Sequence, residues 1–219
     1  MRKAENLIAV VDYHKGNLKS VERGLIGVGA DARITDDVRE IEAAEAIVLP
    51  GVGAFTDAAE SMRALGQMEL LCRRVSEGVP FLGICLGLHL MFEGGVEHAQ
   101  GAPTPGMGMI PGIVEALPKV DAQGQAYKIP HVGWNNVDYV EGAEDCALFD
   151  GIPSGEFFYF THSYAAPESA TTIATTEHSI VFPCVTQVGE RAFGVQFHPE
   201  KSSDAGAKLL ANFVKLALK

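Results

Sequence analysis

The sequence predicts an α/β fold: a single domain, residues 1–219, built on a Rossmann-like mixed sheet with helices on both faces. The chain has 219 residues, of which 47% are hydrophobic, enough for one sizeable core but short for two full domains. In the first half, apolar runs alternate with amphipathic segments, a pattern typical of a parallel sheet covered by helices. In the second half, short apolar segments follow one another closely, which indicates antiparallel strands added beside the parallel core.

Three apolar runs in the first half predict short, fully buried strands at Leu7–Val11, Ala46–Leu49 and Val79–Ile84. An amphipathic helix is predicted from Asn17 to about residue 28. The amphipathic stretch from residue 55 to residue 77 predicts two short helices separated near Gly66.

The second half predicts strands separated by Gly, Pro, Asp and Ser. They are Gly112–Leu117, His131–Asp138, Glu156–Phe160, Thr171–Thr176, Val181–Thr186 and Ala192–Phe197. The Gly- and Pro-rich stretch over residues 99–112 predicts a loop. A last amphipathic helix is predicted from about Ser203 to Leu218.

Composition argues against several classes of protein. Against 28 Asp and Glu the chain has 17 Lys and Arg, and a net charge of −11 disfavours nucleic acid or an anionic membrane as the main partner. The N-terminus is a poor signal peptide, and the longest apolar run, residues 81–92, is too short to span a bilayer, so we expect a cytoplasmic protein. The cysteines Cys72, Cys85, Cys146 and Cys184 are scattered, which predicts neither a disulfide framework nor a zinc site.

Cys85 is the candidate nucleophile. It ends a predicted buried strand, has Gly83 and Gly87 two positions away on either side, and is followed at once by a helix-like run. This is the pattern of a nucleophile elbow, with Cys in place of Ser. The helix N-terminus favours the thiolate. The alternative is a structural cysteine in an apolar strand beside two packing glycines.

The candidate base lies far along the chain, in the segment GVQFHPE. A predicted strand leads to His198 at the sheet edge where α/β proteins place their chemistry. Pro199 favours an extended backbone at His198, so His198 and Glu200 can share one face. Glu200 can then accept from one ring nitrogen while the other faces Cys85.

A tetrahedral intermediate needs oxyanion donors. The backbone N–H of Leu86, directly after the nucleophile, is one candidate. The other is the segment Gly51, Val52 and Gly53 after a buried strand, where glycine lets a peptide plane turn at low cost. An ordinary Gly-rich turn is the alternative, and a phosphate cradle is less consistent because the P-loop lysine and the third dinucleotide glycine are absent.

In the order PGVGAF, GICLG and FHPE, these segments resemble the class I glutamine amidotransferases. Further segments are similar to the glutaminase subunit of imidazole glycerol phosphate synthase, an enzyme of histidine biosynthesis. They are DYHKGNL at 12–18, KIPHVGWN at 128–135, YFTHSY at 159–164 and the Lys-Ser pair that closes FHPEKS at 197–202. The resemblance extends from residue 7 to about residue 203.

The resemblance implies a role for each matching residue. Cys85, His198 and Glu200 match the family's catalytic triad, and Gly51, Val52 and Gly53 match its oxyanion strand. The positions that hold glutamine are matched by Leu86, His89, Glu97, His162, Ser163 and Tyr164. The positions that face the partner chain are matched by Asn17, Trp134, Asn135 and Lys201.

Two residues depart from the family pattern. The family usually has Gln at the position of His89, which lies one helical turn after the nucleophile. We expect His89 still to contact glutamine, more weakly, with simple helix packing as the alternative. The family usually has Gly at the position of His14, where a positive φ would strain a histidine.

By resemblance, the chain hydrolyses glutamine and passes ammonia to a separate (β/α)₈ barrel cyclase in a heterodimer, with no metal or organic cofactor. Two rival hypotheses remain. One is a glutaminase that serves a different synthase. The other is a regulatory subunit that kept the fold, which the departure at His89 favours and the intact triad disfavours.

Overall fold

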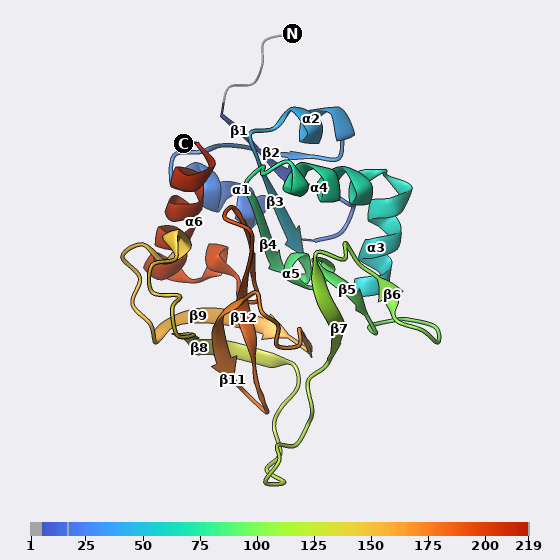
Figure 1. The fold of residues 1–219 in the computed structure, drawn as a ribbon, viewed down its shortest axis with the longest axis vertical. Coiled ribbons are helices and arrows are strands. Elements are labelled where there is room, and N and C mark those ends of the chain that lie inside the picture. Colours follow the sequence, from blue (N-terminus) through green and yellow to red (C-terminus); the bar gives the residue numbers. More distant parts are fainter. Residues whose placement is uncertain (1–5, 17, 219) are drawn as a thin grey trace.

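The computed structural model describes residues 6–16 and 18–218, which form helices and strands in an α/β arrangement (Figure 1). The elements of the first half are β1 (Leu7–Val11), α1 (Leu18–Gly27), β2 (Asp31–Thr35), α2 (Val38–Ala43), β3 (Ala46–Gly51), α3 (Phe55–Ala64), α4 (Gln67–Ser76), β4 (Phe81–Cys85), α5 (Leu86–Leu90), β5 (Phe92–Gly95) and β6 (Thr104–Pro105). Those of the second half are β7 (Ile110–Ala116), β8 (His131–Tyr139), η1 (Ala147–Phe149), β9 (Glu156–His162), β10 (Tyr164–Ala165), β11 (Thr172–Glu177), β12 (Val181–Val188), β13 (Ala192–Val195), η2 (Pro199–Lys201) and α6 (Ser203–Ala217).

Within the described residues, the main sheet has nine strands in the order β2-β1-β3-β4-β13-β12-β11-β8-β9. The strands from β2 to β13 pair in parallel, and those from β13 to β9 pair antiparallel. The predicted mixed sheet, parallel first and antiparallel later, is therefore confirmed. The strand β13 is the junction, since it pairs with β4 on one side and β12 on the other.

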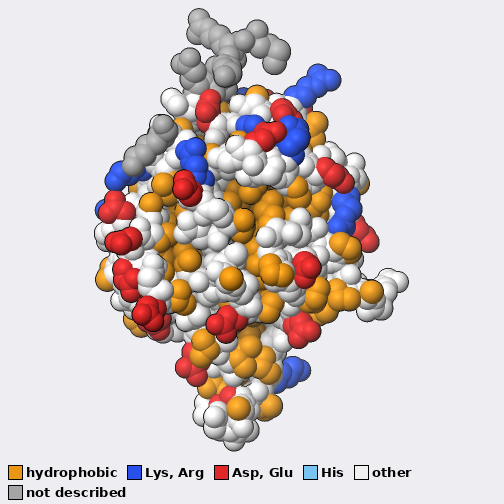
Figure 2. Space-filling model, in the orientation of Figure 1, with side chains coloured by type: hydrophobic (Ala, Val, Ile, Leu, Met, Phe, Trp, Pro, Cys, Tyr) orange, Lys and Arg blue, Asp and Glu red, His pale blue; other side chains and the backbone are white. Residues whose placement is uncertain are grey.

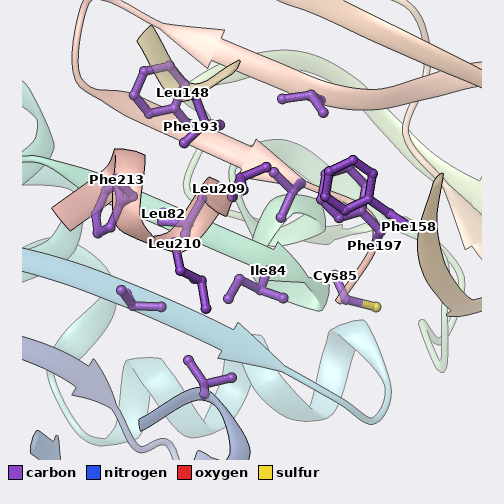
Figure 3. Close-up of a cluster of buried hydrophobic side chains, with 14 of the residues drawn as sticks. Leu82, Ile84, Cys85, Leu148, Phe158, Phe193, Phe197, Leu209, Leu210 and Phe213 are labelled. Atoms are coloured by element: carbon purple, nitrogen blue, oxygen red, sulfur yellow. The ribbon is translucent and has the colours of Figure 1, made fainter. Parts of the chain in front are cut away.

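Helices cover both faces of the parallel part, as predicted. Successive residues of a strand point to opposite faces, and β1 shows this: Ile8 and Val10 pack into one hydrophobic cluster, while Ala9 and Val11 pack into another. The first cluster includes side chains of α1 and α6, and the second includes side chains of α2, α3, α4 and α5. In Figure 3, Cys85 lies at one edge of the first cluster, next to the stacked pair Phe158 and Phe197, whose ring centroids are 4.1 Å apart.

Some elements differ from the predictions. The strand β2 and the helix α2 were not predicted, because β2 is an edge strand in which only Ala32 and Thr35 are buried. The predicted strand Gly112–Leu117 lies in β7 except for Leu117, but β7 belongs to a separate small sheet, ordered β10-β7-β5-β6. The predicted loop over residues 99–112 contains β6 and the start of β7.

The surface has no basic region on the face drawn in Figure 2. Lys and Arg side chains there are scattered among more numerous Asp and Glu side chains. Among the helices of residues 6–16 and 18–218, none combines the length and the apolar character needed to cross a bilayer.

Candidate active site

Cys85 occupies a sharp turn between a strand and a helix. It is the last residue of β4, and α5 begins with the next residue. Its backbone has φ 53° and ψ −106°, a combination that strains a residue with a side chain and that is typical of functional sites. The residue is 7% exposed. The predicted elbow is therefore present in the structure, and the thiol stands at the carboxyl end of a central strand.

Glycines make this turn possible. A Cβ atom on Gly83 would lie 2.7 Å from the carbonyl carbon and oxygen of Gly87, and one on Gly87 would overlap the carbonyl oxygen of Leu49 in β3. A Cβ on Gly51 would lie 2.5 Å from Cβ of Leu86. Because the backbones of β3, β4 and α5 approach this closely, only glycine fits at these positions.

His198 and Glu200 form a buried pair beside the elbow. The strand β13 pairs in parallel with β4 and ends at Val195, so the chain reaches His198 at the same edge of the sheet as Cys85. His198 has φ −104° and ψ 95°, the extended conformation predicted from Pro199. Its Nδ1 lies 2.8 Å from Oε1 of Glu200, and both side chains are 3% exposed.

The environment of His198 favours the charged ring. Burial acts to lower the pKa of His198, but hydrogen bonding to Cys85 and Glu200 and their negative charges outweigh it and raise the pKa to about 9. The Nε2 atom is buried and has no hydrogen bond of ordinary geometry to the described residues. A nucleophile, a base and a carboxylate that orients the base are thus adjacent, which is the arrangement needed for covalent catalysis by a thiolate.

A cavity of about 430 Å³ opens in front of Cys85. Nine predicted site residues line it: Val52, Gly53, Cys85, Leu86, His89, Glu97, His162, Ser163 and Tyr164. Behind it, a much narrower cavity of about 10 Å³ is lined by Gly51, Val52, His198, Glu200 and Lys201 together with residues of the parallel core. Val52 lines both, so the predicted oxyanion strand adjoins both cavities.

Three of the four predicted oxyanion residues, Val52, Gly53 and Leu86, line the front cavity. Leu86 is the first residue of α5, where a backbone N–H has no acceptor within the helix. Val52 is 39% exposed, and Gly53 has φ 102°, a conformation that favours glycine. Tyr13 lies next to this strand and is fully buried. Burial and the charge of Cys85 raise the pKa of its hydroxyl, while the backbone N–H of Val52 acts to lower that pKa.

Glu97 reaches the cavity from the segment after β5. Its carboxylate accepts a hydrogen bond from the N–H of Phe55 at 3.1 Å, at the N-terminus of α3. Thr56 donates its hydroxyl to the carbonyl of Glu97 at 2.8 Å, which fixes the backbone as well. Burial raises the pKa of Glu97, while the bond from Phe55 opposes that rise. The structure therefore holds one carboxylate rigidly at the wall of the cavity.

His162 belongs to a chain of neutral rings under the cavity. Its Nδ1 donates to the carbonyl of Tyr164 at 2.8 Å, so Nε2 accepts from Nδ1 of His131 at 3.0 Å. Burial lowers the pKa of His162 to about 3 and that of His131 to about 4, and both rings are neutral at pH 7. The carbonyl of Ser163 accepts from the N–H of Leu117. These bonds fix the backbone of residues 162–164 at the cavity wall.

His89 makes a contact that was not predicted. Its Nε2 lies 2.7 Å from Oε1 of Gln196, and the amide nitrogen of Gln196 lies 3.7 Å from Sγ of Cys85. Burial lowers the pKa of His89 to about 4. His89 also lines the front cavity, as expected for a residue that contacts glutamine. It therefore contacts the cavity directly and the nucleophile through Gln196, and does not only pack within its own helix.

The predicted interface residues do not share one location. Trp134 on β8 is 52% exposed, and its ring stands edge-on to Tyr159 on β9. Lys201 is exposed, with its ammonium 6.0 Å from the centre of the same tyrosine ring. The side chain of Asn135 points to the other face of β8, where it donates to the carbonyl of Glu177 at 2.7 Å. Asn17 lies outside the described residues.

At His14 the backbone has the positive φ that strains a histidine. His14 has φ 65°, in the left-handed region where glycine is unstrained. The chain compensates with local hydrogen bonds: the N–H of His14 donates to Asp12 at 2.6 Å, and Nε2 lies 2.9 Å from Oδ2 of Asp36. The bond to Asp36 raises the pKa of His14.

Three residues at the site were missed in the sequence. Gln196 and Tyr13 lie within the motifs GVQFHPE and DYHKGNL, but neither motif predicts a role for them. Thr161 lies next to the predicted His162, and its carbonyl is 4.0 Å from Sγ of Cys85. Across residues 6–16 and 18–218, no group of three or more His, Cys, Asp or Glu side chains is arranged to hold a metal ion.

Comparisons with known proteins agree with this geometry. The family model "Glutamine amidotransferase class-I" matches residues 9–217. Proteins named imidazole glycerol phosphate synthase subunit HisH are similar over nearly the whole chain. The one from Syntrophotalea carbinolica is 42% identical (94% of this chain, 98% of that one), and the one from Moorella thermoacetica is 44% identical (95% and 94%).

Solved structures share the fold. A crystal structure of a glutamine amidotransferase superposes with a TM-score of 0.70 at 20% identity, covering 95% of this chain and 98% of that one. A putative GMP synthase protein from Thermoplasma acidophilum gives 0.63 at 22% identity, with 96% and 93% covered. The family match and the relatives establish that this chain belongs to the class I glutamine amidotransferases.

Proposed function

We propose that this chain is the glutaminase subunit of an imidazole glycerol phosphate synthase and supplies ammonia for histidine biosynthesis. One observation carries the proposal: a strained cysteine elbow lies beside a buried His198–Glu200 pair and opens on a cavity of about 430 Å³. The relatives at 42–44% identity bear the name of this synthase's subunit.

The first half of the reaction forms a thioester. The thiolate of Cys85 attacks the side-chain amide carbon of glutamine, and the C=O electrons move onto oxygen. His198, charged at neutral pH, gives its Nε2 proton to the departing nitrogen, and ammonia leaves as the C–N bond breaks. Glu200 stabilises the charged ring and keeps Nε2 directed at the reacting atoms.

The second half restores the enzyme. Neutral His198 takes a proton from water, the resulting hydroxide attacks the glutamyl thioester, and the C–S bond breaks to give glutamate and the thiolate. In both halves, the oxyanion can be stabilised by the N–H groups of Leu86 and of the Gly51–Gly53 strand. Water and glutamine are consumed, and glutamate and ammonia are produced.

The walls of the cavity suit the rest of the glutamine molecule. Glu97 places a carboxylate where it can bind the α-ammonium group. The fixed backbone at Ser163 and Tyr164 forms another wall. His89 is a neutral contact, which we expect to hold the α-substituents more weakly than the Gln usual in the family.

The face formed by β8 and β9 is the proposed contact with a (β/α)₈ barrel cyclase. Val132, Trp134 and Phe157 are each more than half exposed, and strand pairing places them on one face. Lys201 lies beside them and also lines the narrow cavity behind the oxyanion strand. A partner bound here would therefore touch a residue adjacent to the histidine pair.

Replacement of the nucleophile tests the proposal. In the complex with its cyclase, Cys85→Ala is expected to abolish glutamate release from glutamine, while synthesis from added ammonium salts continues. Cys146→Ala is the matched control, since Cys146 lines a different cavity from Cys85, and it should keep both activities. Glutamate release by Cys85→Ala at a rate comparable to wild type would refute the proposal.

A further inference from the structure

Besides its interaction with the ring of His198, the sulfur of Cys85 has a side-chain donor nearby. The amide nitrogen of Gln196 lies 3.7 Å from Sγ, within hydrogen-bonding distance for sulfur. Gln196 is fully buried, and its backbone N–H donates to the carbonyl of Cys184 at 2.8 Å, which ties the residue to β12. It stands two residues before His198, so one short segment brings both groups to the nucleophile.

The ring of His89 can hold the Gln196 amide with its NH₂ end towards the sulfur. Because burial keeps the ring of His89 neutral at pH 7, the ring carries a single N–H. That N–H lies on Nε2 when it donates to Oε1 of Gln196, 2.7 Å away. The NH₂ group of the amide is then directed at Sγ. The reversed amide would place an oxygen against the thiolate, which is electrostatically unfavourable.

We propose that Gln196 is a positioning residue for the nucleophile, and that its amide, held in orientation by His89, donates an N–H to the thiolate of Cys85. The proposal rests on the proposed function of Cys85. It gives His89 a second role beside its contact with the cavity. Nε2 then serves the nucleophile, while the ring also lines the cavity.

A buried amide also needs hydrogen-bond partners for purely structural reasons, so the test must separate the two roles. The measurement is the rate of alkylation of Cys85 by iodoacetamide from pH 5 to 10, on the full chain without glutamine, with the Cys85 peptide quantified by mass spectrometry. Gln196→Met keeps the volume and removes the donor. His198 and Tyr13 are the titratable groups that interact with Cys85, and this substitution leaves both of them unchanged.

In Gln196→Met, the midpoint of the profile of alkylation rate against pH is expected to rise by about one pH unit. The reason is that the thiolate loses a hydrogen-bond donor. Glutaminase kcat in the complex should fall about 10-fold, with KM for glutamine within about two-fold. Gln67→Met is the matched control: Gln67 is also fully buried and donates its side chain to the carbonyl of Asp12 at 2.8 Å, away from Cys85. It should lower thermal stability without moving the alkylation profile.

His89 variants provide an independent arm if Gln196→Met does not fold. His89→Leu cannot orient the amide and should shift the profile in the same direction. His89→Gln can donate to Oε1 of Gln196 and should restore the wild-type profile. An unshifted profile in Gln196→Met, an equal shift in Gln67→Met, or identical profiles for His89→Leu and His89→Gln would each overturn the proposal. A wild-type Cys85 that reacts no faster than Cys146 would instead refute the proposed function.

Discussion

The Nδ1 atom of His198 lies 2.8 Å from Oε1 of Glu200, and each of these side chains is 3% exposed. The two residues flank Pro199, so the pair depends on local backbone geometry as well as on the fold. Because the pair is shielded from water, its electrostatic interaction is stronger than that of a surface pair. This relationship makes Glu200 the residue that sets the orientation and charge of the base.

Glu200→Gln should therefore impair the chemical step. The amide can keep the shape of the site but no longer stabilises the charged ring, and it permits the wrong tautomer. We expect kcat for glutamine hydrolysis in the complex to fall by about 10²–10⁴-fold, with a small change in KM. Steady-state glutamate release measures this. Glu190→Gln, on the turn after β12, is the control, and a Glu200→Gln rate near wild type would contradict the assignment.

The same pair should affect stability with a defined sign. The pKa of His198 is about 9 in the folded chain, above the ordinary 6.5. A raised folded pKa contributes stability that is fully present below pH ~6.5 and is lost as the pH rises through about 9. We expect the free energy of unfolding to fall over this window more steeply in wild type than in Glu200→Gln. Urea unfolding at pH 6, 8 and 10 measures it, and parallel curves would show that Glu200 does not raise this pKa.

The elbow should not tolerate a side chain at Gly87. A Cβ there would overlap the carbonyl oxygen of Leu49, so β3 or α5 must shift. We expect Gly87→Ala to lower the free energy of unfolding by about 2 kcal/mol or more. Gly27→Ala is the matched control because a Cβ on Gly27 meets nothing within 4 Å, and it should be neutral or slightly stabilising. Equal thermal denaturation of the two variants would mean that the elbow is looser than the structure indicates.

His89→Gln should improve glutamine binding. An amide at this position can keep the bond to Gln196 and offers a more flexible polar contact to the cavity. We expect a lower KM with kcat within a few-fold of wild type, because the change acts mainly on ground-state binding. His178→Gln, which alters a histidine absent from the cavity lining, is the control. If KM for glutamine is the same in all three proteins, His89 does not contact the substrate.

The glutaminase should be slow without its partner. Val52 lines both the front cavity and the narrow cavity that Lys201 also lines. Gly51 and Gly53 flank it, so its peptide plane can turn at low cost. One misdirected oxyanion donor costs about 10²–10³ in kcat, so the proposed cyclase partner, with its own substrate bound, should raise the rate by that factor. Steady-state rates with and without the cyclase measure it. If the free chain already runs at the coupled rate, the partner does not reorient this peptide plane. The assignment of Cys85, His198 and Glu200 as the triad would not change.

Much of this site could be predicted because its chemistry depends on short-range patterns. The elbow needs glycines at fixed spacing around Cys85, and the His198–Glu200 pair needs an extended residue before a proline. Both requirements can be recognised as short motifs in the sequence. The fold class was also predictable, since buried parallel strands are continuous apolar runs and the antiparallel strands are closely spaced.

The parts that could not be predicted depend on distant contacts. The partner of His89 is Gln196, 107 positions away, and no periodicity relates them. Trp134 and Asn135 were both predicted to face the partner, but their side chains lie on opposite faces of β8, because neighbouring residues of a strand point in opposite directions. The strand β2 has too few buried residues to form an apolar run. In each case, tertiary structure decides what the local pattern leaves open.

The position of β13 has a consequence for the order in which the chain is made. It is the last strand to leave the ribosome, yet it lies between β4 and β12 and alone joins the two halves of the main sheet among the described residues. The 113 positions from Cys85 to His198 take roughly 6–23 s to translate at 5–20 residues per second. Until then β4 has an unpaired edge, and its thiol has neither base nor amide donor. A prematurely released chain would carry an inert cysteine and an aggregation-prone strand, and it would not waste glutamine.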